Sequence, residues 1–206
     1  MDTDRYVDLD WKSELLDQLE FHWEHQLRPR LNGLTDDEYF WEPVPGCWSI
    51  RPRAQATTPL AMGPGEFVMD YALPPHDPEP VTTIAWRLAH VIVGVFNSRT
   101  AAHFGHAPAR PGATGWRAHD QWAMWDYATT AAEAIRQLDA AYAGWAEGVR
   151  GLGADELGRP CGPAEPFPDA SMAGLVLHIH REVIHHGAEI SLLRDLYQWK
   201  GDRDAL

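Results

Sequence analysis

The sequence predicts an all-α protein, a four-helix bundle with long irregular connections between the helices. Four long segments carry apolar residues at helical spacing, and none reads convincingly as a strand. Proline-rich stretches separate the segments, as expected of irregular connections. The chain has 206 residues, of which 45% are hydrophobic, so we expect one domain with a substantial core over residues 1–206.

The first helix is predicted from Trp11 to Leu34, because apolar residues recur along two neighbouring helical rows. Gly33 lies near its end, and Thr35 is placed to cap a short helical turn. The region from Pro43 to Pro80 contains too many prolines for a regular helix. The two rows consist of Leu15, Leu19, His22, Gln26 and Arg30, and of Leu16, Leu27 and Leu31.

The remaining helices follow from the same periodicity. The second covers residues 82–105, with Thr82 or Thr83 as its N-cap. The third is predicted from Asp120 to Val149 and the fourth from Met172 to Trp199. The inward row of the third helix is predicted to hold Trp122, Trp125, Ala132, Ile135, Leu138, Tyr142 and Trp145.

The charge of the chain argues against a nucleic-acid partner. The formal net charge is -13 and we find no basic patch, so a phosphate backbone would be repelled.

No run approaches the roughly 18 apolar residues of a membrane-spanning helix, and the acidic N-terminal segment is unlike a signal peptide. We therefore expect a cytoplasmic protein without a membrane partner. Cys47 and Cys161 lie far apart in loops, and we expect two reduced thiols.

The fourth helix places two titratable residues within its apolar row, and these are the first candidate metal ligands. Glu182 and His186 are four residues apart, so their side chains can aim at one point. A carboxylate buried alone would cost several kcal/mol, so something must compensate it. A carboxylate and an imidazole are both ligands of zinc. The row consists of Leu175, Ile179, Glu182, His186, Ile190, Leu193 and Tyr197.

A third ligand must come from another helix, and His90 is the candidate. It is the polar interruption in the apolar face of the second helix, which a bundle could bring opposite Glu182 and His186. Two alternatives stay open: His90 as an ordinary core histidine, and Glu182 with His186 as an internal ion pair or as hydrogen-bond partners of Tyr or Trp. Glu189 is expected to pair with Arg194 or Arg181.

Three segments together resemble the DinB/YfiT-like superfamily. They are WRLAH, which contains His90, EVIHHGAEISLLRDLY on the fourth helix, and WEPVPGCWSI after the first helix. The resemblance implies a four-helix bundle with a divalent metal held by His90, Glu182 and His186. Many members carry H-x-x-x-H where this chain has Glu182 and His186. In having a glutamate at the first of these positions, this chain is similar to the N-terminal domain of mycothiol-dependent maleylpyruvate isomerase.

The resemblance further implies a metal-dependent thiol transferase or isomerase with a small-molecule substrate. Zinc is the first expectation, with nickel or iron also suited, and the thiol would be a low-molecular-weight one such as mycothiol. His185 could act as general base or hold a metal ligand, or could be a partly exposed helix histidine. Arg87 and Arg194 could hold an anionic substrate or could be solvated. The alternative function is a non-catalytic metal-binding or ligand-binding bundle, and either could form a homodimer.

Overall fold

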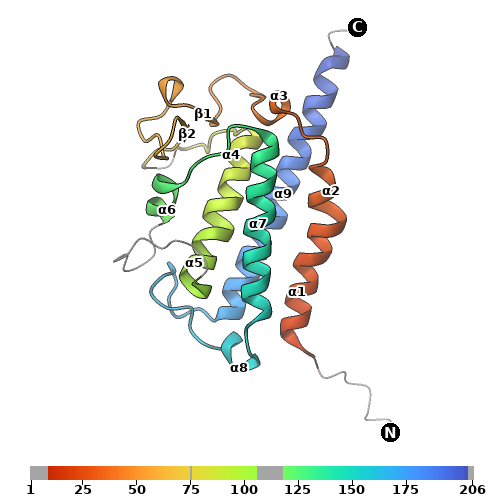
Figure 1. Ribbon diagram of the computed structural model, residues 1–206, viewed down its shortest axis with the longest axis vertical. Helices are drawn as coiled ribbons and strands as arrows, with labels where there is room; N and C mark the ends of the chain where they lie inside the picture. The colour runs from red at the N-terminus through yellow and green to blue at the C-terminus, as the bar shows by residue number, and fades with distance from the viewer. Residues whose placement is uncertain (1–8, 75, 106–117, 204–206) are drawn as a thin grey trace.

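The structure is a computed structural model that describes residues 9–74, 76–105 and 118–203. Four long helical segments lie side by side as a bundle, and the predicted all-α class is confirmed (Figure 1). The elements are α1 (Trp11–His22), η1 (Trp23–Leu27), α2 (Arg28–Arg30), α3 (Asp36–Tyr39), β1 (Ile50–Pro52), η2 (Arg53–Gln55), β2 (Phe67–Met69), α4 (Ile84–Ala89), η3 (His90–Asn97), α5 (Ser98–Phe104), α6 (Ala118–Met124), α7 (Ala131–Arg150), α8 (Ala154–Leu157) and α9 (Met172–Arg203).

The first long helix changes its winding part-way, which changes the face that it buries. Asp10 caps α1 by accepting from the amides of Lys12 and Ser13, and η1 is a π-helical stretch. In a π-helical turn the hydrogen bond joins residues five apart. His22 and Leu27, five residues apart, are both buried, whereas Gln26 and Arg30, which strict helical spacing placed on the same row as His22, are exposed.

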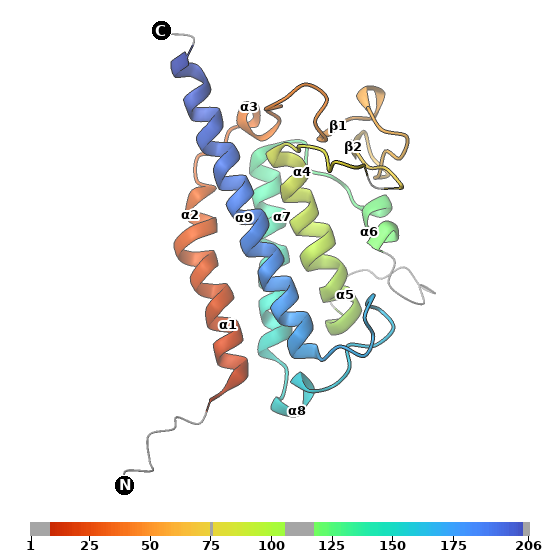
Figure 2. The ribbon, with the colours of Figure 1, turned by 180° about the vertical axis from the view of Figure 1, so that it is seen from behind.

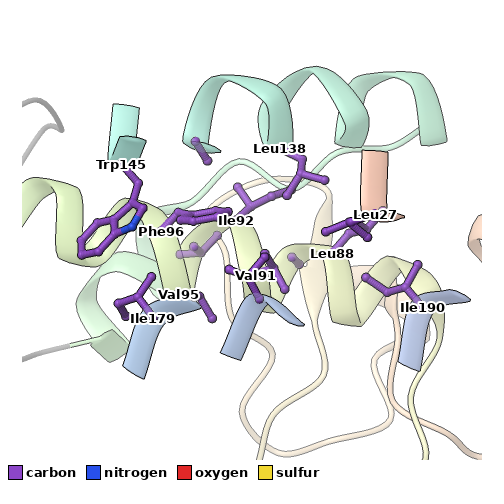
Figure 3. Packing of buried hydrophobic residues seen from close by; sticks show 14 of the residues in the cluster. Leu27, Leu88, Val91, Ile92, Val95, Phe96, Leu138, Trp145, Ile179 and Ile190 are labelled. Carbon is purple, nitrogen blue, oxygen red and sulfur yellow. The ribbon is translucent and has the colours of Figure 1, made fainter. Parts of the chain in front are cut away.

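The second long helix is also π-helical, in its central part η3. Thr83 caps α4 by accepting from the amide of Trp86 at 3.2 Å, which confirms one of the two predicted caps. The η3 segment lies at the centre of the bundle, and six of its residues are buried. Figure 3 shows Leu138 of α7 on one side of this helix and Ile179 of α9 on the other.

The third helix is shorter than predicted, because a capping pair starts it at Ala131. Thr130 accepts from the amide of Glu133 at 3.2 Å, while the Glu133 carboxylate accepts from the amide of Thr129 at 3.3 Å. This arrangement resembles a capping box, with the glutamate reaching the amide just before the cap, and it marks the N-terminus of a helix. The predicted Asp120–Val149 helix is therefore two helices, α6 and α7, joined by irregular chain, and Ala132 is exposed rather than inward.

The proline-rich region contains a two-stranded antiparallel sheet, so the prediction that no segment forms a strand was wrong. Strands β1 and β2 pair with Ile50 opposite Met69. The buried Asp70 accepts from the Ser49 amide at 3.1 Å and from Arg51 Nε at 2.7 Å. Its own carbonyl accepts from Trp86 Nε1 at 2.8 Å, which attaches the sheet to α4 beside His90.

Arg194 was expected at the surface or beside Glu189, and this prediction was wrong. It is buried, and its Nε and Nη2 donate to the two carboxylate oxygens of Glu38 at 2.6 and 3.0 Å. Its Nη1 donates to the carbonyl of Asn32 at 3.0 Å. The guanidinium therefore fastens α9 to the turn between α2 and α3, because it satisfies backbone carbonyls that α2 leaves open.

Two further sequence predictions can be compared with the structure. Cys47 and Cys161 are both free and buried, as expected for reduced thiols. Across the described residues, none of the helices is long and apolar enough to cross a membrane.

The buried His180 predicts an acid-sensitive fold. Trp145 Nε1 donates to His180 Nε2 at 3.2 Å, and burial lowers the pKa of His180 to about 4. In the unfolded chain the pKa of His180 is about 6.5. Between pH 6.5 and pH 4 the unfolded chain therefore binds more protons than the folded protein, so the free energy of unfolding falls as the pH decreases below 6.5. We expect urea unfolding of the metal-free protein to show a loss of about 2–3 kcal/mol by pH 4.5 from this residue. A His180→Gln variant that kept the full pH dependence would contradict this.

Candidate metal centre

The bundle brings the three predicted ligands together. One ligand atom each from His90, Glu182 and His186 lies within 4.8 Å of the others. His186 Nε2 is 3.4 Å from Glu182 Oε2, and the His90 and His186 rings meet at 83° with centroids 4.6 Å apart. These donors are those of a mixed N/O site for zinc or a similar divalent ion. The three residues could therefore hold one metal ion.

His90 is held in place by the residues that precede it on the same helix. Its ring stacks on Trp86 with centroids 5.4 Å apart and an angle of 5° between the planes. Trp86 is itself fixed by its hydrogen bond to the Asp70 carbonyl. The π-helical stretch η3 begins at His90, and such stretches are often found at functional sites.

His186 is oriented by Glu189. His186 Nδ1 lies 2.7 Å from Glu189 Oε2, a distance at which the ring N–H donates to the carboxylate. Arg87 Nε forms an ion pair with the same oxygen at 3.0 Å. The sequence-based pairing of Glu189 with Arg194 or Arg181 was therefore wrong, since Glu189 pairs with Arg87 and His186. A carboxylate on one ring nitrogen fixes the tautomer and leaves Nε2 for a metal.

Both imidazoles are kept neutral, the form that binds metals. Burial lowers the pKa of His90 to about 3, with smaller effects of the same sign from His186, Arg87 and Arg99. Burial also lowers the pKa of His186, partly opposed by Glu189. Among the described residues, His90 Nδ1 has no hydrogen-bond partner although it is buried. An unpartnered buried nitrogen is costly without a ligand, so the site fits a metal.

We call the three candidate ligands, His90, Glu182 and His186, the triad. The triad lies on the wall of a cavity of about 440 Å³, which we call the outer cavity. Its apolar walls include Trp48, Tyr71 and Trp86, and Arg87 and His185 add polar groups. This volume lies within the range of small-molecule sites. The arrangement can therefore present a metal to a small ligand.

A second, smaller cavity of about 140 Å³ lies along the other side of His90 and Glu182. Arg99 also lines it, with its Nε 3.5 Å from Glu165 Oε2. His103 Nε2 lies 2.9 Å from Glu165 Oε1. Sequence reasoning missed this buried cluster, because Glu165 belongs to an irregular loop whose position no periodicity predicts.

The other histidines of α9 lie apart from the triad or at its margin. His185 is 65% exposed, with its Nε2 3.6 Å from Glu189 Oε1, so it lies on the cavity rim. His178 Nδ1 is 3.6 Å from Glu182 Oε1, and His180 points into the core. His185, His186 and Glu189 form a second group that could hold a metal, although the short His186–Glu189 contact is a hydrogen bond.

Comparison with known proteins identifies the family of the chain. The sequence profile of the DinB superfamily matches residues 18–190. The chain belongs to the DinB superfamily. The matched DinB region contains all three residues of the triad, and the resemblance seen in the sequence is confirmed. No curated protein matches the chain.

Glu189 is a residue of the candidate site in this DinB protein whose partners sequence reasoning assigned incorrectly. Its spacing of three from His186 was a usable signal, because residues three apart on a helix are neighbours. Arg87, which precedes His90 by three residues, carried the same signal on the facing helix.

Removing the Glu189 carboxylate is expected to weaken metal binding without removing a ligand. In a Glu189→Ala variant, His186 loses its hydrogen-bond acceptor, and we expect metal affinity to fall by about 10–100-fold. Competition with a chromophoric chelator measures this change. Glu189→Gln keeps an acceptor and should fall less, and equal affinity in all three proteins would show that Glu189 does not support the site.

Proposed function

We propose that this chain is a metal-dependent enzyme that transfers a low-molecular-weight thiol to a small electrophile, as a transferase or an isomerase. The metal would be a divalent ion, zinc first and nickel or iron as alternatives, held by His90, Glu182 and His186. The observation that carries the proposal is the convergence of these three side chains on the wall of the outer cavity. Three protein ligands leave a coordination position for a ligand entering from that cavity.

The chemistry follows from what the site could bind. When bound, a divalent ion would lower the pKa of a ligating thiol, so that the thiolate is present at neutral pH. In a transferase step, the sulfur forms a bond to the electrophilic carbon as that carbon releases its leaving group. In an isomerase step, the sulfur adds to one carbon of a double bond and is expelled after rotation about the resulting single bond.

The protein's own residues would bind, orient and move a proton. Trp48, Tyr71 and Trp86 would exclude water from the body of the ligand. His185, on the rim, would accept the thiol proton and pass it to solvent. Glu189 would keep His186 in its metal-binding tautomer.

Cobalt substitution tests the proposal. Untagged protein loaded with Co²⁺ is titrated with small thiols while the sulfur-to-cobalt absorption band is followed. We expect a saturable band, and thiol-dependent turnover of at least one electrophile in a broad panel. Metal-loaded protein that forms no thiolate band and shows no turnover would contradict the enzyme and leave the non-catalytic metal-binding bundle.

A further inference from the structure

We propose that Arg87 recognises a carboxylate on the small molecule that binds in the outer cavity, and thereby sets the substrate class of the site. The inference rests on the proposed function, since it concerns the ligand of that site. It makes Arg87 the specificity residue for a carboxylated thiol or a carboxylated electrophile.

Arg87 lies where two cavities meet. It lines the outer cavity next to His90 and Glu182, and its side chain is only 16% exposed. It also lines a groove of about 1030 Å³ that continues along α9 past Leu192 and Leu196. Arg87 is therefore one of the residues at the junction through which a ligand would reach the triad from this groove.

The guanidinium is held in one orientation by groups that leave its far side available. Arg87 Nε pairs with Glu189 at 3.0 Å, and the guanidinium carbon is 5.3 Å from the centroid of the Trp86 ring. Among the described residues, no protein acceptor hydrogen-bonds Nη1 or Nη2. These two nitrogens form the fork that binds a carboxylate through two parallel hydrogen bonds.

The charges around Arg87 oppose an anion in the metal-free site and would no longer do so once a divalent ion is bound. Glu189 balances Arg87, and the exposed Glu79 lines the same cavity and also attracts it. A divalent ion would bring two positive charges, and Glu182 would cancel one of them. Arg87, Glu189, Glu79 and Glu182 together carry two net negative charges, so the metal-free site would repel a carboxylate, whereas a divalent ion would bring the sum to neutral and leave the Arg87 fork to bind one.

The walls of the outer cavity restrict the remainder of the ligand. Trp48, Tyr71 and Trp86 give the outer cavity apolar surface beside Arg87 and the triad. A small ligand with a sulfur, a carboxylate and a short apolar linker would match this combination of groups. The expected ligand class is therefore a small mercapto-carboxylate, or an electrophile with a carboxylate at a similar distance.

The test compares two thiols of the same shape in the cobalt-loaded protein. Mercaptopropionate carries the carboxylate, and mercaptopropanamide replaces it with a neutral amide. We expect the wild type to bind mercaptopropionate about 10–100-fold more tightly, as expected for a charge-assisted fork. Arg87→Gln should reduce this ratio to near one, and Arg87→Lys should keep only part of it.

Two control variants separate recognition from other effects. Arg181→Gln removes an exposed arginine of α9 that does not line the outer cavity, and it should keep the wild-type ratio. Glu189→Gln disturbs the partner of Arg87 and His186, and it should weaken metal binding while keeping a preference for the carboxylate. Thermal melts confirm that each variant is folded.

The outcomes distinguish this inference from the proposed function. A thiolate band with no preference for the carboxylate, or a preference that persists in Arg87→Gln, overturns the role of Arg87 on the thiol. Steady-state kinetics then tests whether Arg87 binds the carboxylate of the electrophile. If Arg87→Gln raises KM for a carboxylated electrophile but not for its amide, this role is supported. Unchanged KM values for both electrophiles overturn it. If neither thiol gives a band, binding of benzoate against benzamide to the zinc-loaded wild type and Arg87→Gln, followed by tryptophan fluorescence, decides Arg87 alone. The proposed function itself fails only if no small thiol gives a band and no electrophile is turned over.

Discussion

Replacing His90 with alanine is expected to lower divalent-metal affinity by more than about 100-fold, because loss of a ligand exceeds the 10–100-fold effect of losing a group that only supports one. Loss of metal should remove the thiolate band and thiol-dependent turnover together. The fold should survive, because the His90 side chain lies at a cavity wall. Burial lowers its pKa and keeps it uncharged, so its removal breaks no ion pair. Elemental analysis of purified, untagged variant protein measures the metal content.

His178→Ala is the matched control for this variant. His178 lies on α9 beside Glu182, but it is outside the group of three that could hold the metal. We expect His178→Ala to keep the metal. A His90→Ala protein with full metal content would contradict the triad, and one that cannot fold would favour a structural role for His90.

Removing the Glu38 carboxylate is expected to cost about 3–5 kcal/mol of unfolding free energy, the range for breaking a buried ion pair from one side. Glu38→Ala leaves the Arg194 guanidinium buried with only carbonyl partners, including that of Asn32. Both side chains are less than a tenth exposed, so solvent cannot replace the lost carboxylate. Chemical denaturation at neutral pH measures the change.

A double variant checks the physical reason. Glu38→Leu with Arg194→Met replaces both charges by apolar groups, and we expect it to recover most of the lost stability, because no unpaired charge stays buried. If Glu38→Ala cost less than about 1 kcal/mol, the pair would behave like an exposed ion pair instead.

The sequence predicted the bundle because apolar periodicity is a local property of each helix. Leu19 and Ile179 are buried, as their spacing indicated, although Gln26 and Arg30 at the end of the first row are exposed. The third helix was extended too far because alanine-rich sequence continues the helical pattern across Thr130. Its T-x-x-E signature with Glu133 was readable in the sequence and would have placed the start correctly.

The small sheet could not be predicted from periodicity. Strand Ile50–Pro52 and strand Phe67–Met69 are three residues each, too short for an alternating pattern to stand out. Their pairing depends on the buried Asp70, whose carboxylate satisfies groups on either side of the turn. Such a contact becomes visible only once the chain is folded.

The candidate site was predictable where a polar residue interrupts an apolar row, and not where it depends on contacts between helices. His90, Glu182 and His186 stand out in this way in the sequence. Arg87 and Glu189 lie beside the apolar rows and do not interrupt them. The contact of Glu189 with His186 was readable from their spacing on α9, but its pairing with Arg87 depends on the facing of α4 and α9 (Figure 2).

The central claim is tested most directly by anomalous scattering from a crystal of untagged protein, supported by elemental analysis of the same preparation. The account predicts one divalent ion per chain, with His90, Glu182 and His186 at about 2.0–2.2 Å and a fourth position open to the outer cavity. A metal-supplemented crystal with no ion between these three residues, or with the ion bound elsewhere on α9, would contradict it.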